Sequence, residues 1–132
     1  MAQAFADATL PMPAWNHRAH VIVAMMAIRR FGERDALTWM RNGIRRLNAA
    51  HGLVETPSRG YHETLTRFWL WRVARFLDST NIDRDSSELA DEAWSACGDR
   101  HLPLEYWSAD RLFSPEARAE WLEPDLKPLD AA

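Results

Sequence analysis

Residues 15–31 read W-N-H-R-A-H-V-I-V-A-M-M-A-I-R-R-F, and this stretch decides the fold class. Its apolar side chains recur every three or four residues, which places them on one face of an α-helix. Asn16 is a suitable N-cap, and Gly32 ends the segment. The face expected to meet the core carries six residues: His17, His20, Val21, Ala24, Ile28 and Phe31. The stretch therefore predicts a helix whose buried face includes two histidines.

The same periodicity predicts two further long helices, over residues 33–51 and 61–77. The connection between them carries the turn and start signals Pro57 and Gly60. The inward face of the first of these helices holds Leu37, Met40, Ile44 and Leu47. The inward face of the second, on the side of His62, holds Leu65, Thr66, Trp69, Val73 and Phe76. Because helices joined by short loops usually pack antiparallel to their neighbours, we expect the three to form an up-down-up bundle.

The rest of the chain predicts shorter elements. Helical candidates cover residues 88–97, 104–113 and 115–122. The leader, residues 1–13, contains two prolines and is expected to be extended, as is the tail, residues 123–132. A chain of 132 residues suits one compact domain. The expected fold is thus a single all-α domain, an up-down-up helical bundle with shorter C-terminal helices.

Composition limits the partners and the compartment. The net charge of -3 gives no general attraction to nucleic acid or to an anionic membrane, and neither partner is expected. The arginines around the first two helices, Arg29, Arg30, Arg34, Arg41, Arg45 and Arg46, are therefore interpreted as a solvated face. The single cysteine, Cys97, excludes an internal disulfide and is interpreted as structural. With no signal peptide and no apolar run of about 20 residues, we expect a cytoplasmic protein.

Four histidines are expected to meet at one end of the bundle. His17 and His20 lie in the first turns of one long helix, His62 begins another, and His51 lies in the last turn of the helix between them. If the first and third long helices point the same way, these ends share one pole. His17 and His20, three residues apart, are neighbours on one helix surface. The pattern therefore predicts a histidine-rich site.

The chemistry of this site favours a metal ion. Three imidazoles with an open position would suit zinc, iron or copper. His17, His20 and His62 are the first candidate ligands, and His51 is a fourth. Glu63 could act as a further ligand or as the base that takes a proton from bound water. The leading hypothesis is a small metal-binding protein, and its catalytic form is a metalloenzyme that acts on a small molecule.

Three alternatives stay open. A histidine near a helix end is more often a hydrogen-bonded core or cap residue than a ligand. The same pole, rimmed by Trp15 and Tyr61, could belong to a non-catalytic module that binds a small molecule or a protein. His62 and Glu63 could also perform acid/base catalysis without a metal. The H-E-x-x-H zinc helix is excluded, because Thr66 stands in the place of its second histidine. The fifth histidine, His101, is expected to face solvent.

Two motifs also resemble a known group. The segment W-N-H-R-A-H at residues 15–20 and the segment G-Y-H-E-T-L-T at residues 60–66, with Ala117-Arg118 and P-D-L at 124–126, resemble a group of small uncharacterised bacterial helical proteins. The resemblance spans most of the chain and implies no reaction. It implies only which positions to test: His17, His20, His62, Glu63, Thr64 and Thr66.

Overall fold

The computed structural model describes residues 1–80 and 83–129, and in this part of the chain the regular structure is helical. The three long helices are α2 (His17–Phe31), α3 (Glu33–Ala50) and α4 (Glu63–Asp78). The shorter ones are α1 (Ala2–Ala6), η1 (Met12–Ala14), α5 (Ser86–Cys97), η2 (Leu102–Glu105), α6 (Ala109–Leu112) and α7 (Pro115–Ala119), where η marks a 3-10 helix. The predicted all-α fold is confirmed. No helix in the described residues is both long and apolar enough to cross a membrane.

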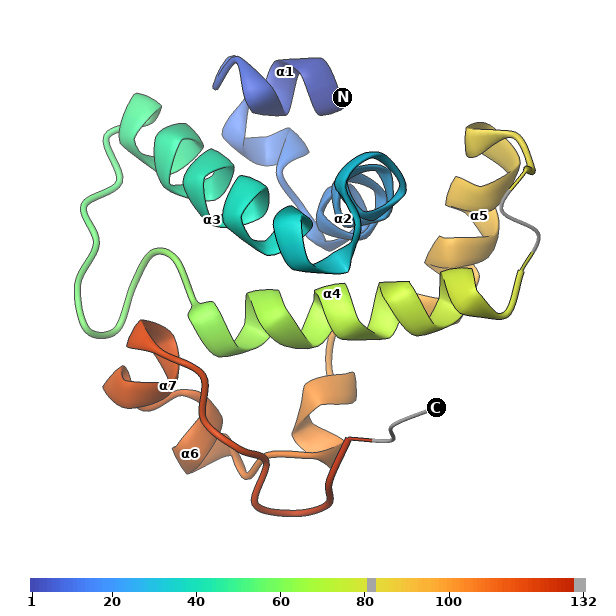
Figure 1. Ribbon diagram of the computed structural model, residues 1–132. Helices are drawn as coiled ribbons and strands as arrows, with labels where there is room; N and C mark the ends of the chain where they lie inside the picture. Colours follow the sequence, from blue (N-terminus) through green and yellow to red (C-terminus); the bar gives the residue numbers. More distant parts are fainter. Residues whose placement is uncertain (81–82, 130–132) are drawn as a thin grey trace.

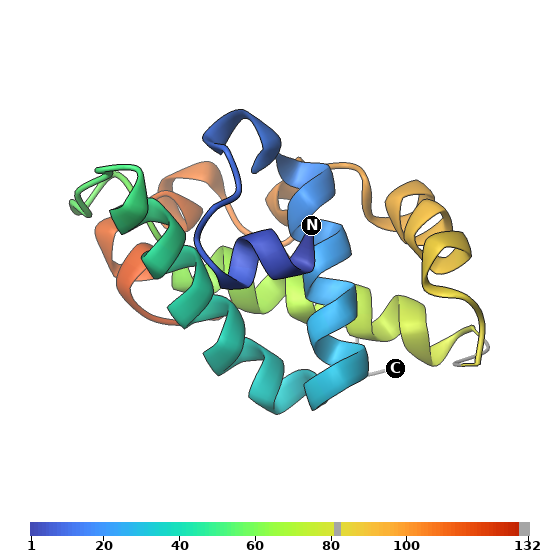
Figure 2. The same cartoon turned by 90° about the horizontal axis from the view of Figure 1, so that it is seen from above.

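Helix α4 lies at the centre of the molecule (Figure 1). On one side it packs against α2 and α3, and on the other side lie η2, α6, α7 and the C-terminal segment. Helix α5 packs against α2 and the C-terminal half of α4, and α1 lies over α2 and α3 (Figure 2). One face of α4 therefore contributes to the packing with the N-terminal helices, while the other holds the C-terminal segment.

The three long helices do not run as parallel rods. Helices α3 and α4 run in opposite directions across the view in Figure 1, as expected for consecutive helices. Helix α2 is seen nearly along its axis in the same view, so it crosses α4 rather than running alongside it. Even so, the beginning of α2, the second half of α3 and the beginning of α4 surround one common space, described below.

Local signals explain where the helices begin and end. The Asn16 side chain accepts a hydrogen bond from the backbone N–H of Ala19 at 2.9 Å and caps α2 as predicted. Gly32, between α2 and α3, has a φ of +85°, a conformation that an L-residue rarely adopts. Ser114 caps α7 in the same way as Asn16 caps α2. These caps place His17 in the first turn of α2.

The leader differs from the extended segment that we predicted. It contains α1, whose Phe5 is fully buried. The Phe5 ring stacks on Trp15 with centroids 4.8 Å apart and lies 5.3 Å from the ring of Trp39. Gly43 of α3 leaves the space that the ring occupies. Packing of this one aromatic anchor against α3 accounts for a helix that local propensity alone would not predict.

The C-terminal part is also more broken than predicted. Instead of one helix over residues 104–113, η2 ends at Glu105 and α6 begins after Ser108, whose side chain caps it. Trp107, between them, is fully buried and donates from Nε1 to the carbonyl oxygen of Leu122 at 3.0 Å. The helix expected over 115–122 ends at Ala119. The tail is non-helical through residue 129, as expected, while residues 130–132 lie outside the described part.

Candidate functional site

A cavity of about 470 Å³ lies among α2, α3 and α4. Seven rings contribute to its lining, those of Trp15, His17, His20, Tyr61, His62, Trp69 and Phe113. The cavity thus brings together three of the four histidines predicted to converge. It also includes the two aromatic residues, Trp15 and Tyr61, that we expected at the rim.

His17 lies between the cavity and α5. Its Nε2 donates a hydrogen bond to the carbonyl oxygen of Cys97, with 3.0 Å between the two atoms. The ring also packs on Trp69 and Trp94, with centroids 4.5 Å and 5.7 Å away. Burial lowers the pKa of His17, with a smaller contribution from the nearby positive charge of Arg100. The ring is therefore neutral near pH 7, and its Nδ1 can accept a hydrogen bond or bind a metal.

His20 is the least engaged of the three histidines. Its ring stacks on Trp15 with centroids 3.9 Å apart and an interplanar angle of 29°. No hydrogen bond joins the ring to the part of the chain that the structure describes. Burial, with a smaller effect of His17, lowers the pKa of His20 to about 4. The ring is therefore neutral near pH 7, and neither of its nitrogens is engaged by the described residues.

His62 is held by two hydrogen bonds. Its Nδ1 accepts the backbone N–H of Leu65 at 3.1 Å and so caps α4, while Nε2 donates to the carbonyl oxygen of Leu112 at 2.7 Å. These bonds require the neutral tautomer with the hydrogen on Nε2. Burial lowers the pKa of His62, and the positive charge of Arg118 lowers it further. The geometry gives this histidine the role of a helix cap, the structural alternative noted for every histidine of the pole.

Glu63 does not line the cavity. Its carboxylate accepts two hydrogen bonds from Arg41, at 3.0 Å and 2.6 Å, and one from the hydroxyl of Tyr61 at 2.6 Å. Burial favours the protonated form, but the hydrogen bonds from Arg41 and Tyr61 outweigh it and lower the pKa of Glu63. The carboxylate is therefore a charged partner of Arg41, and its geometry favours a structural role over that of a base.

The two remaining histidines lie outside the cavity. His51 is exposed, and its Nε2 donates to the carbonyl oxygen of Leu10 at 2.8 Å. Unlike the other three, His51 does not line the cavity, because this bond turns the ring toward the N-terminal segment. His101 is exposed, as predicted. Cys97 is buried, and burial raises the pKa of its thiol, which agrees with a structural role.

The cavity also contains residues that sequence reasoning missed. Arg100 and Arg118 both contribute to its lining. Arg118 belongs to the Ala117-Arg118 pair in the resemblance, which was the only signal for it. Of the two threonines named there, Thr66 lines the cavity and donates to the carbonyl oxygen of His62 at 2.8 Å, whereas Thr64 donates to that of Glu120 at 2.9 Å.

The metal hypothesis stays a prediction. Within residues 1–80 and 83–129, no three His, Cys, Asp or Glu side chains come close enough together to hold one ion. His17 and His20 keep the chemistry of metal ligands, because both are neutral and lie one turn apart on α2. His62 could join them only by giving up its hydrogen bond to Leu65 or to Leu112.

Comparisons of the chain with protein-family models, with curated proteins and with solved structures found no match. The two histidine motifs therefore gain no support from known proteins. The cavity and its lining residues are the observations from which a function can be argued.

Proposed function

We propose that this protein binds a small molecule in the cavity formed by α2, α3 and α4. The single observation that carries the proposal is a cavity of about 470 Å³ lined by aromatic rings and by a histidine, His20, that lacks a hydrogen-bond partner in the described residues. Ligand sites commonly have volumes of about 300–1,000 Å³ and combine apolar walls with a few polar groups. The cavity has both properties.

The walls favour a planar ligand. The rings of Trp15, which also stacks on Phe5 and His20, and of Trp69 line the cavity, as do the aliphatic side chains of Ile44, Leu65 and Leu70. Aromatic rings bury a large area, and stacked pairs add about 0.5–1.5 kcal/mol beyond that burial. The open nitrogens of His20 can accept or donate one hydrogen bond to a polar atom of the ligand. Apolar burial would supply the affinity, and His20 would orient the ligand.

A matched pair of variants tests the proposal. Leu53 lines the cavity, whereas its neighbour Val54 is 75 % exposed and does not. Leu53→Trp should fill part of the cavity, and Val54→Trp adds the same ring outside it. Benzoate, benzamide, indole-3-acetate and indole-3-acetamide would be titrated while backbone amide resonances are followed by NMR. We expect shifts around the cavity in the parent and in Val54→Trp, and weaker binding in Leu53→Trp. Equal binding by the two variants, or no shift with any compound, would contradict the proposal.

A second candidate is the binding of a divalent metal ion by His17 and His20. Their spacing on one helix face and their neutral rings support it. Two imidazoles leave most positions of a zinc, iron or copper ion open for water or substrate, which would permit metal-assisted chemistry. Elemental analysis and zinc titration of tag-free protein test this candidate. Loss of binding in His20→Gln but not in His101→Gln is expected, and unchanged zinc binding in His20→Gln would exclude it.

A further inference from the structure

We infer that the molecule bound in this cavity is a small organic anion, a carboxylate carried on a planar apolar body. The inference rests on the proposed binding function and adds the charge of the ligand. Two arginines, Arg100 and Arg118, contribute to the lining, and no Asp or Glu of the described residues does. A cavity with cationic groups and no carboxylate among its lining residues attracts anions.

Arg118 has donors to spare. Its Nη1 donates to the carbonyl oxygen of Gly60 at 2.8 Å, and its Nε–H is buried without an acceptor in the described residues. A guanidinium carries five N–H donors in a planar fork that matches a carboxylate. A buried donor without an acceptor is costly, so an oxygen atom that reached this N–H would relieve that cost. The guanidinium is therefore suited to hold a carboxylate.

Arg100 supplies the second charge. It is exposed, follows α5, and makes no hydrogen bond or ion pair with the residues that the structure describes. The neighbouring Asp99 does not line the cavity, and its Oδ1 accepts the backbone N–H of His101 at 3.0 Å. Arg100 can thus attract an anion to the cavity without first breaking an ion pair.

The other nearby charges do not cancel this field. Glu63, which follows the cavity residue His62, is paired with Arg41 through two hydrogen bonds. The three cavity histidines are neutral near pH 7, since burial lowers the pKa of each. The charge of Asp99 also acts on His17, but Asp99 lies outside the lining, so the charged residues that line the cavity are the two arginines. The same field opposes a divalent cation, which is why the observations favour an anion over the metal candidate.

The rest of the lining indicates the chemistry of the uncharged part of the ligand. Apart from the two arginines, the lining residues are mainly aromatic and aliphatic. An apolar ring would pack against these walls, while a single carboxylate reaches Arg118. A highly charged ligand fits less well, because the apolar walls cannot replace the water that it would lose.

The test compares an acid with its uncharged amide. Indole-3-acetate and indole-3-acetamide have nearly the same shape, and their dissociation constants can be measured by isothermal titration calorimetry near neutral pH. A hydrogen bond to a charged group is commonly worth about a tenfold change in affinity or more. We expect the acetate to bind at least about tenfold more tightly than the acetamide. Added salt should narrow this gap, because Arg100 is exposed to solvent.

Three variants show which arginines cause the preference for the acetate over the acetamide. Arg100→Gln and Arg118→Gln should each reduce the preference for the acetate about threefold or more. Arg46→Gln, which removes the same charge from an exposed position outside the cavity, should leave it unchanged. Because Arg118 also binds Gly60, circular dichroism must confirm its fold, and Arg100→Gln provides an independent test. Equal affinity for acid and amide overturns this inference but leaves the proposed function standing, whereas binding of neither overturns both.

Discussion

His62 and Leu112 join the beginning of α4 to the end of α6 through one hydrogen bond, in which Nε2 lies 2.7 Å from the carbonyl oxygen. The other ring nitrogen of His62 caps α4 by accepting the N–H of Leu65. A single buried side chain thus satisfies a free helix N–H and a helix C-terminal carbonyl at once. It ties the C-terminal segment to the central helix.

We therefore predict that His62 contributes to stability even without any ligand. His62→Ala removes the cap and the bond to Leu112, and should lower the free energy of unfolding by about 2 kcal/mol. His62→Asn can restore the cap but cannot reach Leu112, so it should cost about 1 kcal/mol. Urea denaturation followed by circular dichroism measures both. If the two variants were equally stable within a few tenths of a kcal/mol, the cap would not contribute as described.

The pair of Glu63 and Arg41 gives a second prediction. The Glu63 side chain is 10 % exposed and that of Arg41 30 %, so Glu63→Gln leaves a partly buried guanidinium without its charge partner. We expect a loss of about 2 kcal/mol in the free energy of unfolding. A double-mutant cycle with Arg41→Gln should give a coupling energy of similar size.

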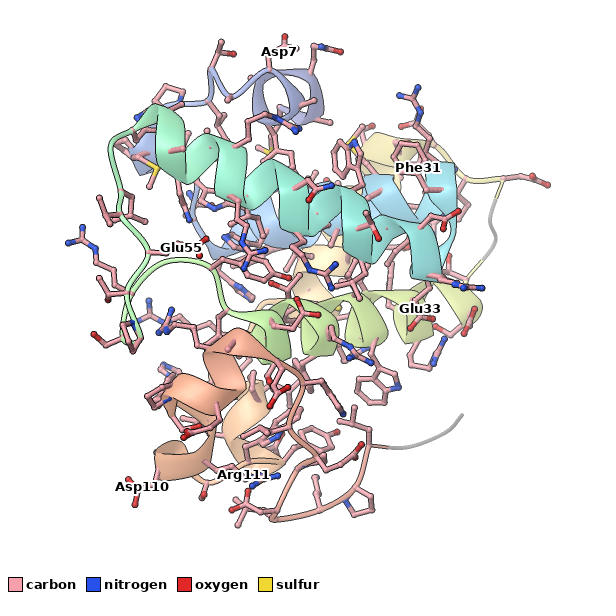
Figure 3. The ribbon with its side chains drawn as sticks, turned by 60° about the vertical axis from the view of Figure 1, so that its left-hand side comes forward. Asp7, Phe31, Glu33, Glu55, Asp110 and Arg111 are labelled. Carbon is pink, nitrogen blue, oxygen red and sulfur yellow. The ribbon has the colours of Figure 1, made fainter. Side chains whose placement is uncertain are left out.

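An exposed ion pair provides the control. Arg45 and Glu55 are joined at 3.0 Å, but their side chains are 48 % and 43 % exposed, and Figure 3 shows Glu55 on the loop that follows α3. The double-mutant cycle of Arg45→Gln and Glu55→Gln should give a coupling energy of less than about 1 kcal/mol. Comparable coupling energies in the two cycles would mean that burial does not strengthen the bond to Glu63.

The long helices could be predicted because local signals agree with the hydrophobic repeat. Asn16 and Gly32 mark the two ends of α2, and both act as the sequence suggests. The helix α1 could not be predicted in this way, because it depends on a contact between Phe5 and α3, which lies far along the chain. Gly43, an isolated glycine inside an otherwise helical pattern, was the available hint of a close approach.

The candidate site was predictable only in part. The helix order placed His17, His20 and His62 near one another, and all three line one cavity. Hydrogen bonding then distinguishes them: His62 has both nitrogens engaged, and His20 has neither bonded to the described residues. Sequence periodicity indicates which face a side chain is on, but it does not indicate the bonds that its atoms make. Arg100 lies in an irregular segment without periodicity, so no pattern pointed to it.

A third prediction concerns pH. The pKa of His20 is about 4 in the folded protein and about 6.5 in an unfolded chain. The unfolded state therefore binds a proton more readily, so this contribution to stability is complete above about pH 6.5 and is lost as the pH falls toward 4. The loss should approach about 3 kcal/mol. Urea denaturation at several pH values between 4 and 7 measures it.

His20→Gln should make stability less dependent on pH in this range. His17 and His62, whose pKa values burial also lowers, will keep part of the dependence. His101→Gln, at an exposed position, serves as the control and should leave the profile unchanged. The pKa of Glu63 lies below that of an ordinary glutamate, because Arg41 and Tyr61 donate hydrogen bonds to it, so its contribution is lost mainly at the acidic end of this range. An unchanged slope in His20→Gln would show that the ring does not titrate as stated.

The last prediction concerns the contact that holds α1. A Cβ atom at residue 43 would overlap Cε2 and Cζ of Phe5, so Gly43→Ala should destabilise the protein by about 1–3 kcal/mol, although alanine favours a helix by about 1 kcal/mol. Asn42→Ala, at the exposed neighbouring position, should instead be neutral or stabilising. The shorter side chain of Phe5→Leu should recover part of the loss in the double variant. Thermal denaturation compares the parent with Gly43→Ala, Asn42→Ala, Phe5→Leu and the double variant. If Gly43→Ala were as stable as the parent, Phe5 would not pack against α3, and the account of why the N-terminal residues form a helix would fail with it.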